Sequence, residues 1–365
     1  MVSMILPTMV RAPLVGYRLI VLAIVATGFT GFGVWVHHMF TTGVLQLASS
    51  FFTASSVMIT IPTAIQIFCW IATIWLGRPW FATPMLFLLG FFITFVIGGL
   101  TGVMLASVPL DSQVHDTHFV VAHLHYVLLG GGAFPLFAAI YYWYPKWTGR
   151  MYHEGLGKLH FWLWIVGVNV TFFPLHILGL SGMPRRIYTY PEGMGWTGMN
   201  QLATVGSYIL ALSVITFVVN MVLSARRGAL AGNDPWAGDS LEWATTSPPR
   251  PYSFVRPPVV QGRGALWSRT PDAPEIVGMP TDRRMSLVTS AMDAEPDNLH
   301  EEPGPTVWPF IASLAVAVLF IWLMFHPMAV LVGGALLMLT LLGWGWPRGK
   351  KNARHDGAVD PREAA

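Results

Sequence analysis

The sequence predicts an all-α protein that crosses a membrane about eight times. Its 365 residues are 54% hydrophobic and only 11% charged, whereas soluble domains are charged at about a quarter of their positions. Apolar runs of about 20 residues, the length that spans a bilayer, recur along the chain. Lysine and arginine gather between these runs. The sequence therefore predicts a polytopic helix bundle in a lipid bilayer, and it gives no reason to expect nucleic-acid binding.

Six long apolar runs come first and two shorter ones follow. The predicted spans are residues 14–40, 51–76, 82–106, 118–144, 159–180, 200–223, 307–325 and 328–346. If the spans alternate in direction, most basic residues fall on one side, which the positive-inside rule makes the cytoplasm. These residues are Arg11, Arg18, Arg78, Lys146, Arg150, Lys158, Arg226, Arg227, Arg348, Lys350 and Lys351. Arg185 and Arg186 fall on the outer side, which indicates a bound anion or, alternatively, a pair of solvated loop charges.

Four regions are expected from the change of composition along the chain. Residues 1–254 carry the six long spans, and residues 255–305 are rich in proline, glycine and charge, which is typical of a mostly irregular linker outside the membrane. A two-helix membrane extension follows at residues 306–347, and a polar tail at residues 348–365. The single cysteine, Cys69, excludes internal disulfides and multi-cysteine metal sites, so any metal or haem must be bound chiefly by histidine.

Ionisable residues gather at the start of the fourth span. His123 and His125 are two positions apart, so a regular helix turns their side chains roughly 200° from each other. They can therefore bind two different groups, one on each side of the helix. His115 and Asp116 lie near the interface, where their oxygen and imidazole ligands suit a hard cation. The alternative interpretation is that these are polar residues whose hydrogen bonds are satisfied within the bundle, for example along a proton path.

A histidine pair, His37 and His38, ends the first span. Adjacent helical residues diverge by about 100°, so both rings can reach one ion if it lies between their faces or if the helix end distorts. Imidazole suits copper, zinc or iron. The pair lies at a depth comparable to that of His123 and His125, which is what one joint site requires. An ordinary interfacial pair is the alternative, but it does not predict this match in depth.

These residues resemble subunit I of the haem–copper oxygen reductases, most closely the bacterial cytochrome c oxidase type. The resemblance is carried by residues 35–40 (WVHHMF), 98–102 (GGLTG), 115–126 (HDTHFVVAHLHY), 167–174 (GVNVTFFP), 179–186 (GLSGMPRR) and 241–249 (LEWATTSPP), and it covers residues 1–254. It implies that the first six spans equal the second half of a twelve-helix core. Residues 1–5 resemble the end of the sixth helix, so an N-terminal half would come from a partner chain, unless the reading frame is truncated.

The resemblance also implies roles for individual residues. His37 and His38 would bind copper B, His123 the high-spin haem and His125 the low-spin haem, with haems of the a type. His115 and Asp116 would bind magnesium. Asp111, Arg185 and Arg186 would contact haem propionates.

The implied function is that of a terminal oxidase in the bacterial inner membrane. It would reduce oxygen to water with electrons that cytochrome c delivers through subunit II, in a complex that also holds subunit III, and it would take up and translocate protons. One departure affects the proton path: Thr63 is retained, but Gln66 occupies the position of the family's lysine. Glutamine cannot carry the charge. A nitric oxide reductase of the same superfamily and an inactive fragment therefore remain as alternatives.

Overall fold

The chain divides into two compact units. The computed structural model describes residues 1–249, 254, 258–270, 285–293, 296–301 and 306–346. The first unit comprises residues 1–249 and 260–273, and the second comprises residues 250–259 and 274–365. The four regions expected from composition, with boundaries at residues 254, 305 and 347, stay predictions. The tail predicted at residues 348–365 lies outside the described residues.

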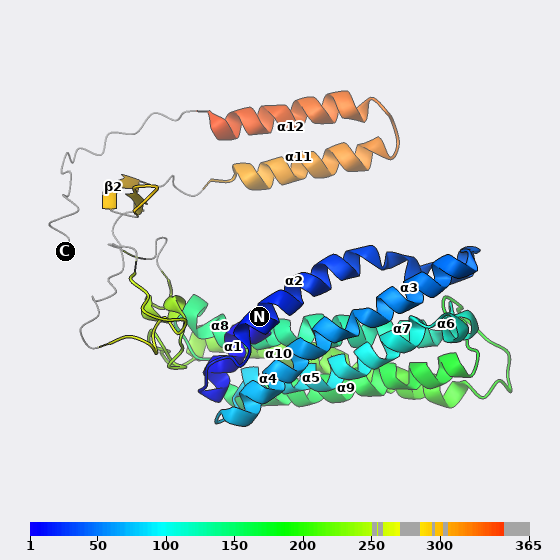
Figure 1. Ribbon diagram of the computed structural model, residues 1–365. Coiled ribbons are helices and arrows are strands. Elements are labelled where there is room, and N and C mark those ends of the chain that lie inside the picture. The colour runs from blue at the N-terminus through cyan, green and yellow to red at the C-terminus, as the bar shows by residue number, and fades with distance from the viewer. Residues whose placement is uncertain (250–253, 255–257, 271–284, 294–295, 302–305, 347–365) are drawn as a thin grey trace. The chain divides into compact units, whose positions relative to one another are not determined.

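The first unit is a bundle of helices (Figure 1). Its elements are α1 (Val2–Val10), α2 (Tyr17–Gly33), the short 3-10 helices η1 (Trp35–His38) and η2 (Phe40–Thr42), α3 (Gln46–Met58), α4 (Thr60–Leu76), α5 (Thr83–Leu105), α6 (Val108–Val114), α7 (His118–Leu128), the π-helix η3 (Leu129–Ala133), α8 (Phe134–Thr148), α9 (Glu154–Leu180), α10 (Thr197–Arg227) and the 3-10 helix η4 (Leu241–Ala244).

Five helical stretches among the described residues are long and apolar enough to cross a membrane. They are Gln46–Leu76, Thr83–Leu105, His118–Thr148, Glu154–Leu180 and Thr197–Arg227. Three shorter apolar helices, α2 and the two in the second unit, correspond to the remaining predicted spans. The predicted all-α, multi-pass membrane architecture is thus confirmed.

The extent predicted for the first span was wrong. Residues 14–40 were expected to form one helix, but α2 ends at Gly33 and the chain continues as two 3-10 turns. Glycine has low helix propensity, and Gly31 and Gly33 lie at this end. The histidine pair therefore lies on η1, where a tighter turn replaces the 100° step of an α-helix.

The span that carries His123 and His125 is interrupted by the π-helix. η3 contains three consecutive glycines, Gly130 to Gly132. A Cβ atom on Gly130 would lie 2.9 Å from the backbone nitrogen of Phe95 in α5. The glycines thus let α5 approach the widened turn between α7 and α8, which positions α7 against α5.

Small residues also bring α9 and α10 together. A Cβ atom on Gly206 of α10 would lie 2.4 Å from the backbone nitrogen of Thr171 in α9, and one on Gly167 of α9 would lie 2.9 Å from the Leu210 side chain. Such close contact is typical of packed membrane helices, where the gain comes from tight van der Waals contact rather than from excluding water.

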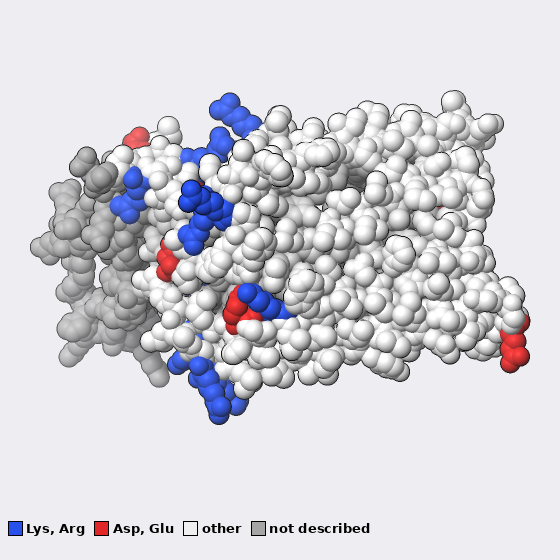
Figure 2. Space-filling model, turned by 90° about the horizontal axis from the view of Figure 1, so that it is seen from below, with Lys and Arg blue, Asp and Glu red and all other residues white. Residues whose placement is uncertain are grey.

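Basic side chains gather at one end of the bundle. On the face that Figure 2 shows, lysine and arginine lie toward one end of the helices and the long middle stretch is nearly free of charge. Arg226 and Arg227 lie in the last turn of α10, and Lys146 lies in the last turn of α8. Helix α6, which carries Asp111, lies at the opposite end (Figure 1), and the histidine pair lines the same cavity as Asp111.

The second unit contains a β-hairpin and a pair of helices. Strands β1 (Met285–Thr289) and β2 (Pro296–Glu301) pair antiparallel, with Leu287 opposite Leu299 and an irregularity between Val288 and Thr289. Helices α11 (Trp308–Leu323) and α12 (Ala329–Gly345) follow. The segment before these helices was expected to be mostly irregular. The sequence analysis did not predict this hairpin, because its two strands are short and the segment is rich in proline and glycine.

Candidate functional site

A cavity of about 350 Å³ lies at the end of the first unit opposite the basic residues. Most of the predicted site residues line it, and they come from η1, α6, α7 and the loops beside them. They are His37, His38, Asp111, His115, Asp116, His123 and Arg185. His125 and Arg186 do not line this cavity, and Thr63 and Gln66 belong to another one.

The histidine pair presents two ring nitrogens to one point. The Nε2 atoms of His37 and His38 are 3.0 Å apart, and the Nδ1 atom of His37 forms a hydrogen bond of 2.9 Å with the Ser56 hydroxyl of α3. Two imidazole nitrogens bound to one ion at about 2.0–2.1 Å, with an angle of about 90–110°, would be roughly 2.8–3.4 Å apart. The observed separation therefore fits a shared metal ion, with Ser56 fixing the His37 ring from behind.

His123 of α7 is oriented by α5. Its Nδ1 atom lies 3.0 Å from the carbonyl oxygen of Gly98 and 3.2 Å from the Thr101 hydroxyl. Donation from Nδ1 to a carbonyl leaves Nε2 as the metal-binding nitrogen. Gly102 makes room for the ring, since a Cβ atom there would lie 2.8 Å from Cε1 of His123.

His125 lies against α9 instead. Its ring stacks on that of Phe172, with centroids 4.1 Å apart and an angle of 12° between the planes. Its Nδ1 atom lies 2.7 Å from the carbonyl oxygen of Val121, one turn earlier in α7, so Nε2 is again the nitrogen left for a metal. The predicted divergence of His123 and His125 is confirmed, because His123 contacts α5 and lines the cavity while His125 stacks on α9.

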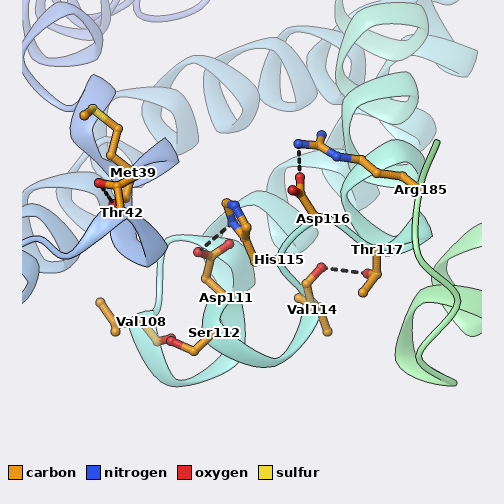
Figure 3. A network of polar contacts seen from close by, with 10 residues as sticks. All are labelled: Met39, Thr42, Val108, Asp111, Ser112, Val114, His115, Asp116, Thr117 and Arg185. Carbon is orange, nitrogen blue, oxygen red and sulfur yellow. Dashed lines mark hydrogen bonds and ion pairs between the residues drawn. The ribbon is translucent and has the colours of Figure 1, made fainter.

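Charged residues form the polar rim of the cavity (Figure 3). The Asp111 carboxylate of α6 lies 3.3 Å from Nδ1 of His115, and the Arg185 guanidinium is paired with Asp116. Burial raises the pKa of the Asp111 carboxyl above its usual value, and the neighbouring His115 opposes this shift.

Backbone contacts join the two loops that carry this rim. Arg185 donates its backbone N–H to the carbonyl of Asp116 at 2.8 Å, and His118 donates to Met183 at 3.0 Å. Asp116 itself adopts a left-handed backbone conformation with φ of 57°, which is uncommon for residues other than glycine. Arg186 is exposed and is also left-handed, with φ of 65°.

The predicted magnesium ligands have separate partners. His115 faces Asp111, and Asp116 faces Arg185, although all four line one cavity. Within the described ranges, no group of three or more histidine, cysteine or acidic side chains converges on one point.

The predicted proton-path residues line a second cavity of about 300 Å³ between α1, α2, α4 and α5. The Gln66 amide donates to the Thr27 hydroxyl at 3.1 Å, and Thr63 lines the same cavity. Ser3 and Trp70, joined by a hydrogen bond of 2.9 Å, also contribute.

The supporting residues were not identified from the sequence. Ser56, Thr101 and Phe172 orient the three rings described above, and Thr27 binds Gln66. Their distances from the histidines along the chain carry no periodic signal. The glycine-rich stretch at residues 98–102 was noted as part of a motif, but its contact with His123 required the structure.

Comparison with known proteins identifies the family. A sequence model described as "Cytochrome C and Quinol oxidase polypeptide I" matches residues 1–209. The chain is 44% identical to cytochrome c oxidase subunit 1 of Bacillus subtilis over 298 residues, covering 79% of this chain and 48% of the relative. It is 49% identical to the Synechocystis protein of the same name over 259 residues, covering 71% of this chain and 47% of the relative.

Two further matches were found. The probable cytochrome c oxidase subunit 1-beta of Nocardia farcinica is 47% identical over 262 residues, which cover 71% of this chain and 44% of that protein. A heme-copper terminal oxidase dimer solved by cryo-EM matches with a TM-score of 0.48 and 23% identity, over 53% of this chain and 39% of that chain. The chain spans less than half the length of these sequence relatives. On the match over residues 1–209, this chain belongs to the cytochrome c and quinol oxidase polypeptide I family.

Proposed function

We propose that this chain forms part of the catalytic subunit of a terminal respiratory oxidase. Within that subunit, oxygen would be reduced to water with electrons from cytochrome c. The observation that carries this proposal is the cavity where His37 and His38 of η1 meet His123 of α7. Three imidazoles from two segments 85 positions apart in the chain line this cavity, and two of them have ring nitrogens 3.0 Å apart. The names of the relatives support the same activity.

In this proposal each histidine has a definite role. His37 and His38 bind copper B, His123 binds the high-spin haem and His125 binds the low-spin haem, both haems being of the a type. The haems and the copper, when bound, supply the electron transfer and the activation of oxygen. The protein's part is to hold the imidazoles: Ser56, Gly98 and Phe172 fix the rings of His37, His123 and His125.

The charged rim serves the outer side of the site. Arg185 and Arg186 donate charge-assisted hydrogen bonds to haem propionates, and Asp111 contributes a further polar contact to a propionate. His115 and Asp116 bind magnesium. Asp116 and Arg185 form an ion pair, so their charges compensate one another. A magnesium ion would compete with Arg185 for Asp116, and a propionate would compete with Asp116 for Arg185.

Protons reach the site from the basic, cytoplasmic side. Thr63 and Gln66 line the second cavity, and the Gln66 amide donates a hydrogen bond to the Thr27 hydroxyl. A neutral amide can support a chain of water molecules without holding a charge itself. This favours proton uptake through a neutral path rather than through a lysine.

The remaining ligands come from outside the described residues. We propose that the N-terminal half of subunit I, present as a partner chain or as a further segment, completes the copper site and the low-spin haem site. Subunits II and III complete the complex, and electrons arrive from cytochrome c through subunit II. Residues 1–254 act as the core half, residues 255–305 as an extramembrane linker and residues 306–347 as a two-helix extension, all in the bacterial inner membrane.

The haem assignments are tested by substitution in the assembled complex. His123→Ala should abolish the carbon monoxide difference spectrum, because carbon monoxide binds the high-spin haem. His125→Ala should remove the low-spin haem absorption instead. His118→Ala, from the same stretch but without an assigned ligand role, should retain both signals. Carbon monoxide binding that survives His123→Ala would exclude that residue as the ligand.

A further inference from the structure

Four arginines surround the turn between α1 and α2, at the basic end of the first unit. Arg11 caps α1, Arg18 lies in the first turn of α2, Arg78 follows α4, and Arg263 comes from the segment after η4. All four side chains are exposed. The cluster is therefore built from segments that are far apart in the sequence.

The backbone segments that carry Arg11 and Arg78 lie next to each other. The backbone N–H of Arg78 donates to Val10 at 2.6 Å, and that of Trp80 donates to Met9 at 2.8 Å. The Arg11 guanidinium lies 5.4 Å from the centre of the Trp80 ring, within cation–π distance. Arg11 also has a left-handed backbone, with φ of 56°, which turns the chain toward the end of α4.

Arg263 contacts the start of α2, the helix that carries Arg18. The Arg263 guanidinium lies 4.4 Å from the centre of the Tyr17 ring, next to Arg18 in the chain. The start of α2 is fixed to α4, because Val15 donates its backbone N–H to the Thr73 hydroxyl at 3.0 Å. Thr73 lies about 5 Å along α4 from the helix end at Leu76. The four arginines thus belong to the end of the first unit where α1 and α4 end and α2 begins.

The positive charge of this cluster is not compensated locally. The ion pairs among the described residues involve other side chains, and none of the four guanidinium groups lies within ion-pair distance of a described carboxylate. Asp239 comes nearest along the backbone, beside Gly264, and it accepts the N–H of Trp267 at 2.9 Å. A guanidinium stacked on a ring by its face keeps its N–H edges free to bind an anion.

The surroundings of the cluster are those of a membrane interface. Tyr17 and Trp80 are aromatic residues of the kind that lie at headgroup level, and Leu19 and Phe81 next to them are exposed apolar side chains. By the positive-inside rule this is the cytoplasmic end, where the leaflet carries anionic lipid. Phosphate-binding groups and acyl-binding groups thus lie side by side.

We propose that Arg11, Arg18, Arg78 and Arg263 bind the phosphate of one anionic phospholipid of the cytoplasmic leaflet. The guanidinium groups donate to the phosphate oxygens, and the acyl chains lie along Leu19 and Phe81. The site is distinct from the histidine cavity at the other end of the bundle, so it does not depend on the function proposed above.

The test compares two double variants of the full chain, solubilised together with its assembly partners. Arg11→Gln/Arg78→Gln removes two cations from the cluster, and Arg226→Gln/Arg227→Gln removes two from the same end of the bundle, on α10. Native mass spectrometry then measures retention of added phosphatidylglycerol and phosphatidylcholine. The proposal predicts one tightly held phosphatidylglycerol that the cluster variant retains at least tenfold less well, while the α10 variant retains it as the unaltered protein does.

Three outcomes would overturn the proposal. Unchanged retention in the cluster variant would exclude the site, and equal loss in both variants would mean diffuse attraction to the basic surface. If inorganic phosphate at millimolar concentration displaced the lipid completely, the cluster would be a free-phosphate site instead. Should the double variant fail to assemble, Arg18→Gln/Arg263→Gln tests the same cluster without altering the residue that caps α1.

Discussion

Three of the proposed ligand histidines are each held by residues from another element. Ser56 of α3 contacts His37, Gly98 and Thr101 of α5 contact His123, and Phe172 of α9 stacks on His125. A ring that is fixed before the metal or haem binds loses less conformational entropy on binding. Ligand position is therefore set by the packing of three helices around the histidine segments.

Gly102 offers a direct test of this positioning. In Gly102→Ala the new methyl group would lie 2.8 Å from Cε1 of His123, so the ring must move away from its bond to Gly98. The carbon monoxide difference spectrum of the assembled complex should shift or lose most of its amplitude. Gly99→Ala is the matched control, because nothing lies within 4 Å of a Cβ atom there. Equal spectra for the two variants would contradict the positioning role of Gly102.

For single residues, the sequence predicted the direction of a side chain better than the residues that it contacts. The two-residue spacing of His123 and His125 was sufficient to predict opposite faces, because the helical period fixes the angle between neighbours. The sequence could not predict that Gly102 faces His123, since that contact depends on how α5 crosses α7. Nor could it predict that Asp116 pairs with Arg185 across two loops.

Single buried or tightly packed residues determine how the helices are joined. Lys146, only 3% exposed, ties the end of α8 to the loop around η4. Its ammonium group donates to the carbonyl oxygens of Asn233 at 2.8 Å and Thr245 at 2.7 Å, and it lies 5.2 Å from the centre of the Trp243 ring. No regular secondary structure holds that loop in place, so this contact is a main candidate for doing so.

Lys146→Met should therefore destabilise the first unit. The substitution keeps the apolar stem but removes two part-buried, charge-assisted hydrogen bonds, a loss of about 1–3 kcal/mol. Thermal unfolding followed by circular dichroism should show a lower Tm. Lys158→Met is the control, because its ion pair with Glu154 is exposed and contributes at most about 1 kcal/mol. A larger loss in the control would contradict the anchoring role of Lys146.

A second stability prediction concerns the contact between α9 and α10. Gly206→Ala would place a methyl group 2.4 Å from the backbone nitrogen of Thr171, so the two helices must separate, at a cost of about 1–3 kcal/mol. The variant should unfold at lower temperature than Gly198→Ala, where nothing lies within 4 Å of the added atom. The account of this helix pair fails if both alanine variants unfold at the same temperature.

The spans were predictable because apolar length is a strong signal, but their ends were not. The third to sixth predicted spans agree with α5, α7 to α8, α9 and α10 to within a few residues. The first was too long, because the change from α-helix to 3-10 turns after Gly33 occurs inside an apolar run. The β-hairpin of β1 and β2 was overlooked because its strands are short.

At the largest scale, the first unit carries different kinds of residue at its two ends. The histidines, Asp111 and Arg185 line one cavity, and the arginine cluster around α1 lies at the opposite, basic end. The second cavity, with Thr63 and Gln66, lies between several helices of the same unit. This polarity is the arrangement that an enzyme needs if it takes up protons on one side of a membrane and binds its metal groups near the other.

The central claim is that His37 and His38 bind a copper ion that the rest of the assembled complex completes. The most direct measurement is the copper and haem content per complex for the unaltered protein, for His37→Ala/His38→Ala and for the control His118→Ala. We predict two haems in all three proteins, and the same copper content in the unaltered protein and the control. The double variant should hold one copper ion fewer per complex and retain both haems, because its haem ligands are intact. Full copper content in the double variant would contradict the claim.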